Sequence, residues 1–192
     1  MISFYLSQAS QILEGTLKGE DVQIHSVSTD TRTIEESALF IAIVGERFDA
    51  HDFCQQAIDK GAKALLVERE LPIDIPQIIV EDTTKALGAL ASWVHEQSES
   101  LTIALTGSCG KTTVKEMLSA VLRQKGHVLA TLGNFNNEFG VPLTLLRSEK
   151  KNGYAVIELG ANHIGEIAYT TRIVKPKTAL VNKGEAAHLE GF

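Results

Sequence analysis

The feature that most constrains the fold is the stretch "LTIALTGSCGKTTVKEM", residues 101–117. An apolar run ends at Leu105, a short segment carries Gly107 and Gly110, and a pattern typical of a helix begins at Lys111. Successive backbone N–H groups in a glycine turn, together with the positive end of a helix, bind phosphate oxygens. The stretch therefore predicts a strand, a phosphate-binding loop and a helix, in this order.

The loop also carries the side chains that phosphate chemistry needs. Lys111 can reach the terminal phosphate oxygens of a nucleotide, and the Thr112 hydroxyl can bind Mg²⁺. The strict G-x-x-x-x-G-K-[ST] pattern needs glycine where this chain has Leu105, so the loop is the shorter form G-x-x-G-K-T-T. A glycine turn with a surface lysine and no ligand is the alternative interpretation. The predicted nucleotide-binding residues are Gly107, Ser108, Cys109, Gly110, Lys111, Thr112 and Thr113.

The segments after residue 100 alternate regularly between strand and helix patterns. We predict strands at 101–105, 127–131, 154–159 and 178–182, and helices over 111–126, after Pro142 and over 165–174. Repeated β-α-β crossovers imply a mainly parallel sheet of the P-loop type with helices on both faces. The sequence stops soon after the last strand, so we expect this sheet to be truncated and the chain to be a fragment.

The first 82 residues predict a separate, small α/β domain. Helical spacing near residues 4–13 stops at Gly15, strand patterns occupy 22–32 and 38–45, a helix covers 50–62, and two short apolar runs follow. Residues 83–100 then form a connecting helix with Asp82 or a threonine as its cap. We expect domains at 1–82 and 101–192.

Composition narrows the class of partner. Eighteen basic and 24 acidic residues give a net charge of −6, and no run of Lys and Arg marks a nucleic-acid-binding face. The two cysteines lack metal-ligand spacing, which favours a reduced compartment. There is no signal-peptide pattern, and no apolar run approaches the roughly 20 residues that span a bilayer. We expect a cytoplasmic protein, without membrane insertion, that binds a small ligand.

Polar residues follow several of the predicted strands. Glu158 ends the apolar run "YAVIEL", where open α/β sheets place ligands, so it can hold a metal ion or serve as a solvated or capping residue. His188 follows the last strand, and from the residues alone a structural or solvated role is favoured. Asn134, Asn136 and Asn137 precede a helix that Pro142 can start; they either shape a turn or bind a polar substrate.

Five quoted motifs together resemble one family. They are "STDTRTIEESALFIAIVGERFDAHDF", "TGSCGKTTVKEM", "GNFNNEFGVPLTLLR", "AVIELGANHIGEIA" and "ALVN" followed by "AHLEGF". In this order they are similar to the ATP-dependent Mur ligases of peptidoglycan synthesis, over essentially the whole chain. The resemblance implies a UDP-substrate domain followed by the first half of a central ATPase domain, in a three-domain parent.

The resemblance also implies roles for individual residues. It assigns catalysis to Lys111, Glu158 and His188, and a metal site to Thr112, Glu158 and His188. Two departures are Cys109, where relatives more often carry a small polar residue, and the charged tail around His188. Candidate substrate-binding residues are Asp30, Thr31, Arg32, Gly45, Glu46, Arg47, Phe48, His51, Asn134, Asn136 and Asn137.

The reaction implied by the resemblance is ATP-dependent amide formation. ATP and Mg²⁺ would activate the carboxylate of UDP-N-acetylmuramoyl tripeptide as an acyl phosphate, which D-alanyl-D-alanine then attacks. We expect a monomer, and the fragment alone should not turn over. Two other classes stay open: a small-molecule kinase or NTPase that uses the same loop, and a non-catalytic UDP-sugar-binding module.

Overall fold

The computed structural model describes residues 1–45 and 48–184. They form two compact units, one centred on residues 3–90 and the other starting at Ala91. The division falls inside α3 (Thr83–Glu96). This helix begins as its sequence predicts, because the Asp82 carboxylate accepts the Lys85 backbone N–H at 2.9 Å and satisfies a donor of the first turn.

The first unit is built on a five-stranded sheet in the part of the chain that the structure describes. Its strand order is β2-β9-β8-β5-β4. Neighbouring strands are parallel except at one edge, where β2 pairs antiparallel with β9. The strands are β2 (Thr16–Lys18), β4 (Ser26–Ser28), β5 (Ala38–Ile41), β8 (Ala62–Val67) and β9 (Gln77–Ile79).

Short helices complete this unit. A 3-10 turn, η1 (Ala50–Phe53), leads into α2 (Cys54–Asp59), which lies against β8. Small buried side chains of this segment, such as Cys54 and Ala57, pack with Phe40 of β5 and Leu65 of β8. The remaining elements are β1 (Phe4–Tyr5), α1 (Leu6–Ile12), β3 (Gln23–Ile24), β6 (Val44–Gly45) and β7 (Phe48–Asp49); β1 pairs with β3 and β6 with β7.

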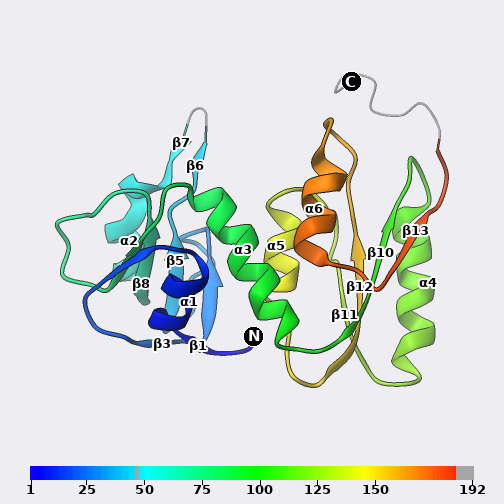
Figure 1. The fold of residues 1–192 in the computed structure, drawn as a ribbon, viewed down its shortest axis with the longest axis horizontal. Helices are drawn as coiled ribbons and strands as arrows, with labels where there is room; N and C mark the ends of the chain where they lie inside the picture. The colour runs from blue at the N-terminus through cyan, green and yellow to red at the C-terminus, as the bar shows by residue number, and fades with distance from the viewer. Residues whose placement is uncertain (46–47, 185–192) are drawn as a thin grey trace. The chain divides into compact units, whose positions relative to one another are not determined.

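The second unit is a parallel sheet with strand order β11-β12-β10-β13. Helix α4 covers one face, and α5 and α6 lie on the other (Figure 1). The connections that follow the adjacent strands β10 and β12 therefore leave for opposite faces, and open α/β sheets place their ligands at the carboxyl ends of two such strands. The elements are β10 (Leu101–Thr106), α4 (Lys111–Arg123), β11 (His127–Ala130), α5 (Gly140–Leu145), β12 (Asn152–Glu158), α6 (Glu166–Val174) and β13 (Thr178–Val181).

These observations confirm the predicted α/β fold class, with a small first unit and a parallel sheet covered on both faces. Three details were wrong. Phe4 lies in β1 and not in the first helix, and the antiparallel edge strand β2 was missed. Helix α5 begins at Gly140, two residues before Pro142, since proline is tolerated throughout the first turn, where no intrahelical N–H donor is needed.

Candidate functional site

The glycine loop connects β10 to α4. Gly107 and Gly110 have φ values of +144° and +76°, a region that glycine adopts without a steric penalty. Gly110 immediately precedes the first residue of α4, so the loop ends at the positive pole of a 13-residue helix. Lys111 turns back over the loop, and its Nζ donates to the Gly107 carbonyl at 2.7 Å. The loop thus brings an ammonium group and a helix N-terminus to one place.

A buried carboxylate lies beside this loop. Glu158 ends β12 opposite Leu105 of β10, and it is 2% exposed. Its two oxygens accept from the Thr112 hydroxyl at 3.2 Å and from the Asn136 amide at 3.0 Å. Its backbone N–H donates to the Thr131 hydroxyl at 2.9 Å. The structure therefore brings together Thr112, Asn136 and Glu158 from three separate segments at the carboxyl edge of the sheet.

The asparagine-rich loop after β11 is held in place by close backbone packing. A Cβ on Gly140 would lie 2.5 Å from the Phe135 backbone, so this position has no space for a side chain. The Asn137 side chain accepts the Gly140 backbone N–H at 2.8 Å, which gives it a structural role at the start of α5. Asn134 is exposed near the loop tip. Of the three asparagines, Asn136 is the one whose side chain reaches Glu158.

Two contacts of this region had no counterpart in the sequence interpretation. Lys115, one turn after Lys111 and 1% exposed, donates to the Thr131 carbonyl at 2.8 Å and pairs with Glu116 at 3.0 Å. Asn182, at the exit of β13, donates to the Cys109 carbonyl at 2.9 Å. A lysine at helical spacing normally indicates solvent exposure, and an asparagine after a strand indicates a turn. No signal in the sequence distinguished Lys115, whereas Asn182 ends the predicted strand 178–182, at the edge where open α/β sheets place ligands.

The "DTR" turn of the first unit is closed by local bonds. The Arg32 side chain and its backbone N–H both donate to the Asp30 carboxylate, with a shortest distance of 2.6 Å. The Arg32 side-chain bonds, followed by the backbone bond, lower the pKa of Asp30 to about 2. The Thr31 hydroxyl donates to the Gln56 side chain at 3.0 Å. With a pKa of about 2, the Asp30 carboxylate is ionised over the physiological pH range.

This turn opens onto a cavity of about 560 Å³. Phe48 contributes an exposed ring, which stacks on Phe53 with centroids 5.3 Å apart. The structure thus brings Asp30, Thr31 and Arg32 together with Phe48 around one hollow. The cavity is lined by Thr29, Asp30, Thr31, Arg32, Phe40, Phe48, Ala50, Phe53 and Gln56.

His51 lies apart from this cavity lining, in a buried network. Its Nδ1 is 2.6 Å from the Asp49 carboxylate, and its Nε2 accepts the Glu68 backbone N–H at 2.9 Å. The Glu68 carboxylate in turn accepts from the Thr83 backbone N–H at 2.8 Å, which ties the end of β8 to the start of α3. The bond from the His51 backbone N–H is the main cause that lowers the pKa of Asp49 to about 2. Both ring nitrogens of His51 therefore have partners within the protein.

Three predicted site residues, Glu46, Arg47 and His188, lie outside the described residues. Gly45 is the last residue of β6 and is exposed. Within residues 1–45 and 48–184, no group of three or more His, Cys, Asp and Glu side chains is arranged to hold a metal ion. No helix in these same ranges is long and apolar enough to cross a membrane.

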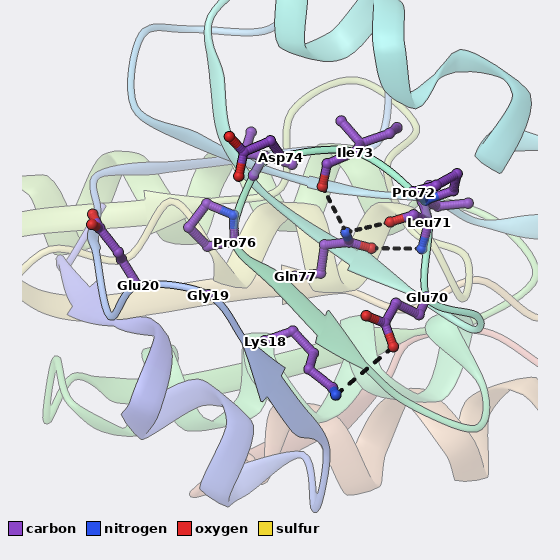
Figure 2. Close-up of a pocket in the computed structure, with 11 residues that line it drawn as sticks. Lys18, Gly19, Glu20, Glu70, Leu71, Pro72, Ile73, Asp74, Pro76 and Gln77 are labelled. Atoms are coloured by element: carbon purple, nitrogen blue, oxygen red, sulfur yellow. Dashed lines mark hydrogen bonds and ion pairs between the residues drawn. The ribbon is translucent and has the colours of Figure 1, made fainter.

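A second cavity of the first unit, of about 640 Å³, lies beneath the loop between β8 and β9 (Figure 2). The Gln77 amide spans this loop: it accepts the Leu71 N–H and donates to the carbonyls of Leu71 and Ile73. At the rim, Lys18 pairs with Glu70 at 3.9 Å. The Gln77 amide holds the loop, and none of the predicted site residues lines the cavity.

The comparison with protein families matches both units. The Mur ligase middle domain matches residues 105–192, and the catalytic domain of the Mur ligase family matches residues 23–95. An α/β protein with a glycine loop, a helix N-terminus and a buried carboxylate at one sheet edge is thereby placed in a known class. The chain belongs to the Mur ligase family.

Individual relatives agree with this assignment. The UDP-N-acetylmuramoyl-tripeptide–D-alanyl-D-alanine ligase of Escherichia coli (strain K12) is 57% identical over the whole chain, which covers 42% of that protein. The enzyme of the same name from Haemophilus influenzae is 51% identical, with 43% of its length covered. The chain thus spans less than half the length of these curated relatives.

Solved structures agree in the same way. A crystal structure of MurF from Acinetobacter baumannii superimposes over all of this chain and 43% of its own, with a TM-score of 0.95 and 42% identity. A MurF ligase from Thermotoga maritima in complex with ADP covers 86% of this chain and 39% of its own, with a TM-score of 0.78 and 34% identity.

Proposed function

We propose that this chain forms the substrate-binding and nucleotide-binding parts of an ATP-dependent amide ligase. The ligase joins D-alanyl-D-alanine to UDP-N-acetylmuramoyl tripeptide in the cytoplasmic synthesis of peptidoglycan precursors, and it acts as a monomer. The observation that carries this proposal is the convergence of Lys111, Thr112 and Glu158 at one edge of a parallel sheet. The names of the relatives supply the substrate class.

The phosphates of ATP bind to the glycine loop, residues 107–113. The left-handed Gly110, the N-terminus of α4 and the ammonium of Lys111 all favour anionic oxygens at this place. Lys111 now rests on the Gly107 carbonyl, from which a terminal phosphate can recruit it as a stronger, charged acceptor. The ADP named in the Thermotoga maritima complex is consistent with this assignment.

The residues around Glu158 fit a magnesium ion. Mg²⁺ prefers oxygen ligands, and the site offers a buried carboxylate next to a threonine hydroxyl. Thr112 and Glu158 would hold the ion, which neutralises phosphate charge when bound. His188 completes our assignment as a further metal ligand and, with Lys111 and Glu158, as a catalytic residue.

The UDP moiety of the substrate binds to the first unit, residues 1–82, and residues 83–100 connect it to the ATP-binding part, 101–192. The cavity beside the "DTR" turn supports this assignment, because it combines a cationic side chain, Arg32, with an exposed aromatic ring, Phe48. The other assigned substrate-binding residues are Asp30, Thr31, Gly45, Glu46, Arg47, His51, Asn134, Asn136 and Asn137.

The reaction proceeds in two steps. The terminal carboxylate of the tripeptide attacks the γ-phosphorus of ATP, which gives an acyl phosphate and ADP. The amine of D-alanyl-D-alanine then attacks the acyl carbon, the amide bond forms, and inorganic phosphate leaves. Lys111 and the loop N–H groups stabilise the charge that spreads over the γ-phosphate oxygens during the first step.

Phosphate release tests the proposal directly in the intact protein. We expect release from MgATP when UDP-N-acetylmuramoyl tripeptide and D-alanyl-D-alanine are both present, with one equivalent of amide per phosphate. Release that needs neither substrate would indicate an NTPase, and phosphate transfer to another small molecule would indicate a kinase. UDP-substrate binding without phosphate release would indicate a binding module.

A further inference from the structure

Two successive residues that follow β13, Asn182 and Lys183, form hydrogen bonds with the glycine loop. The Asn182 side-chain amide donates to the Cys109 carbonyl at 2.9 Å. The Lys183 carbonyl accepts the Ser108 backbone N–H at 2.7 Å, and the Asn182 backbone N–H donates to the Thr106 carbonyl at 2.9 Å. The loop is therefore held by the chain that leaves the neighbouring strand as well as by its own helix.

The two loop glycines face this same segment. A Cβ at Gly110 would lie 2.6 Å from the Asn182 amide nitrogen, and a Cβ at Gly107 would lie 3.0 Å from the Lys183 backbone nitrogen. The positive φ values already disfavour other residues at both positions. The close approach is a second, independent reason for glycine at these two positions.

These hydrogen bonds also fix the orientation of two peptide groups in the glycine loop. The C=O and N–H of one trans peptide point in opposite directions. Because the Cys109 carbonyl faces Asn182, the Gly110 N–H, which belongs to the same peptide, points away from β13. Because the Ser108 N–H faces Lys183, the Gly107 carbonyl points the other way, to where it accepts from Lys111 Nζ.

We propose that Asn182 is a positioning residue that holds the glycine loop in its phosphate-binding conformation before the nucleotide arrives. It turns the Cys109 carbonyl, which would repel a phosphate oxygen, away from the ligand and presents the following N–H in its place. Donors that are oriented in advance need no rearrangement on binding, which preserves affinity. This inference rests on the proposed function, since it assumes that residues 107–113 bind nucleotide phosphates.

The expected loss of nucleotide affinity in Asn182 variants follows from the one side-chain hydrogen bond to the loop. Asn182→Ala loses the bond to the Cys109 carbonyl and should weaken MgADP binding by roughly three- to tenfold. Asn182→Asp keeps the shape but sets an acceptor against that carbonyl and a negative charge beside the phosphates. We therefore expect affinity to fall in the order wild type, Asn182→Ala, Asn182→Asp. A role in filling space alone predicts that hydrogen exchange of the loop in Asn182→Asp, measured without nucleotide, equals that of the wild type.

The test uses two measurements on the intact protein. Hydrogen exchange of the peptide that contains residues 107–112, without nucleotide, reports on the loop itself. Titration with a fluorescent ADP analogue and Mg²⁺ reports on affinity. Lys177→Ala is the matched control, because Lys177 is exposed and precedes the opposite end of the same strand.

The outcomes separate the inference from the function. Faster loop exchange and weaker MgADP binding in Asn182→Ala, with the control unchanged and the same melting temperature, support the inference. Unchanged exchange and affinity in Asn182→Ala, with normal MgADP binding by the wild type, overturn the inference and leave the function standing. A third outcome is faster exchange in the variant with no MgADP binding even by the wild type. It would show that Asn182 holds the loop, but it would overturn both the role of the loop in nucleotide binding and the proposed function.

Discussion

The two candidate regions of the molecule are assembled in different ways. In the second unit, Glu158 binds Thr112 and Asn136, which lie 46 and 22 residues away in the sequence. In the first unit, Asp30 and Arg32 are two residues apart, and their bonds are formed within a single turn. A site built from distant segments requires the whole sheet to be folded, whereas a local turn holds itself. Changes in the second unit should therefore have larger effects on chemistry, and changes in the first unit should affect binding or local stability.

The largest effect is expected at Lys111. Lys111→Ala in the intact protein should lower turnover about 10²-fold or more, because a preorganised charge on the transferring phosphate is lost. Lys125→Ala is the matched control: this lysine is exposed and follows the other end of α4. The measurement is phosphate release at saturating substrates. Near-normal turnover in Lys111→Ala would remove the glycine loop from the mechanism.

The next effect concerns the framework of the first unit. His51→Ala leaves the Glu68 N–H without its partner and removes the imidazole bond to the Asp49 carboxylate, so it should lower local stability by about 3 kcal/mol. Hydrogen exchange of β8 and the start of α3 measures this loss, and the exposed His25→Ala provides the control. Unchanged exchange together with lost UDP-substrate affinity would show that His51 contributes to substrate binding and has no role in the framework.

A pH effect should follow from His95 in the second unit. Burial lowers the pKa of His95 to about 4, and its ring nitrogens contact the hydroxyls of Ser148 and Thr102 at 2.7 and 2.8 Å. The unfolded state, with the ordinary pKa of 6.5, takes up the proton first, so stability is complete above that pKa and falls as the pH drops towards 4. Between pH 7 and pH 5 the loss should be roughly 2 kcal/mol.

Urea denaturation of the intact protein at these two pH values checks the histidine effect. The pH-dependent loss should shrink in His95→Gln, which keeps a polar side chain but does not titrate. His127→Gln serves as the control, because His127 is exposed at the start of β11. An equal pH dependence in wild type and His95→Gln would contradict the assignment to His95.

The smallest effect is expected at the "DTR" turn. Asp30→Asn weakens the contact with Arg32 and should raise the KM for the UDP substrate by up to about tenfold, with turnover at saturation unchanged. Protein stability should change little, since exposed ion pairs contribute little. Asp74→Asn, in the second cavity of the same unit, is the matched control and should leave KM unaltered. If Asp30→Asn lowered turnover by the same factor as it raised KM, the "DTR" turn would contribute to the chemical step as well as to substrate binding.

The local features of the fold and of the candidate site could be predicted from the sequence. The glycine loop, its flanking strand and helix, and the carboxyl-edge position of Glu158 all follow from short-range patterns, and the structure has them. These patterns work because strand-to-helix turns and parallel crossovers restrict where a loop can lie. The start of α3 at an acidic cap is a further example.

What could not be predicted depends on pairing between distant segments. The hydrogen bond from Asn182 to the Cys109 carbonyl requires β13 to lie next to β10, and the order of strands in the sheet could not be read from the sequence. The buried Lys115 is indistinguishable by spacing from an exposed helical lysine. His51 lies in a motif that resembles a substrate loop, yet its Nε2 accepts the backbone N–H of Glu68, which follows β8 and is distant in the sequence.

Cys109 lies in the glycine loop to which we propose that nucleotide phosphates bind, so the reactivity of its thiol reports on this binding. Cys109 is exposed in this loop, whereas Cys54 is buried and burial raises the pKa of its thiol to about 11. Alkylation of the intact protein, followed at each cysteine by mass spectrometry, should slow about tenfold or more at Cys109 when saturating MgATP is present, with Cys54 unreactive in both cases. Equal rates at Cys109 with and without MgATP would show that nucleotide phosphates do not bind to this loop.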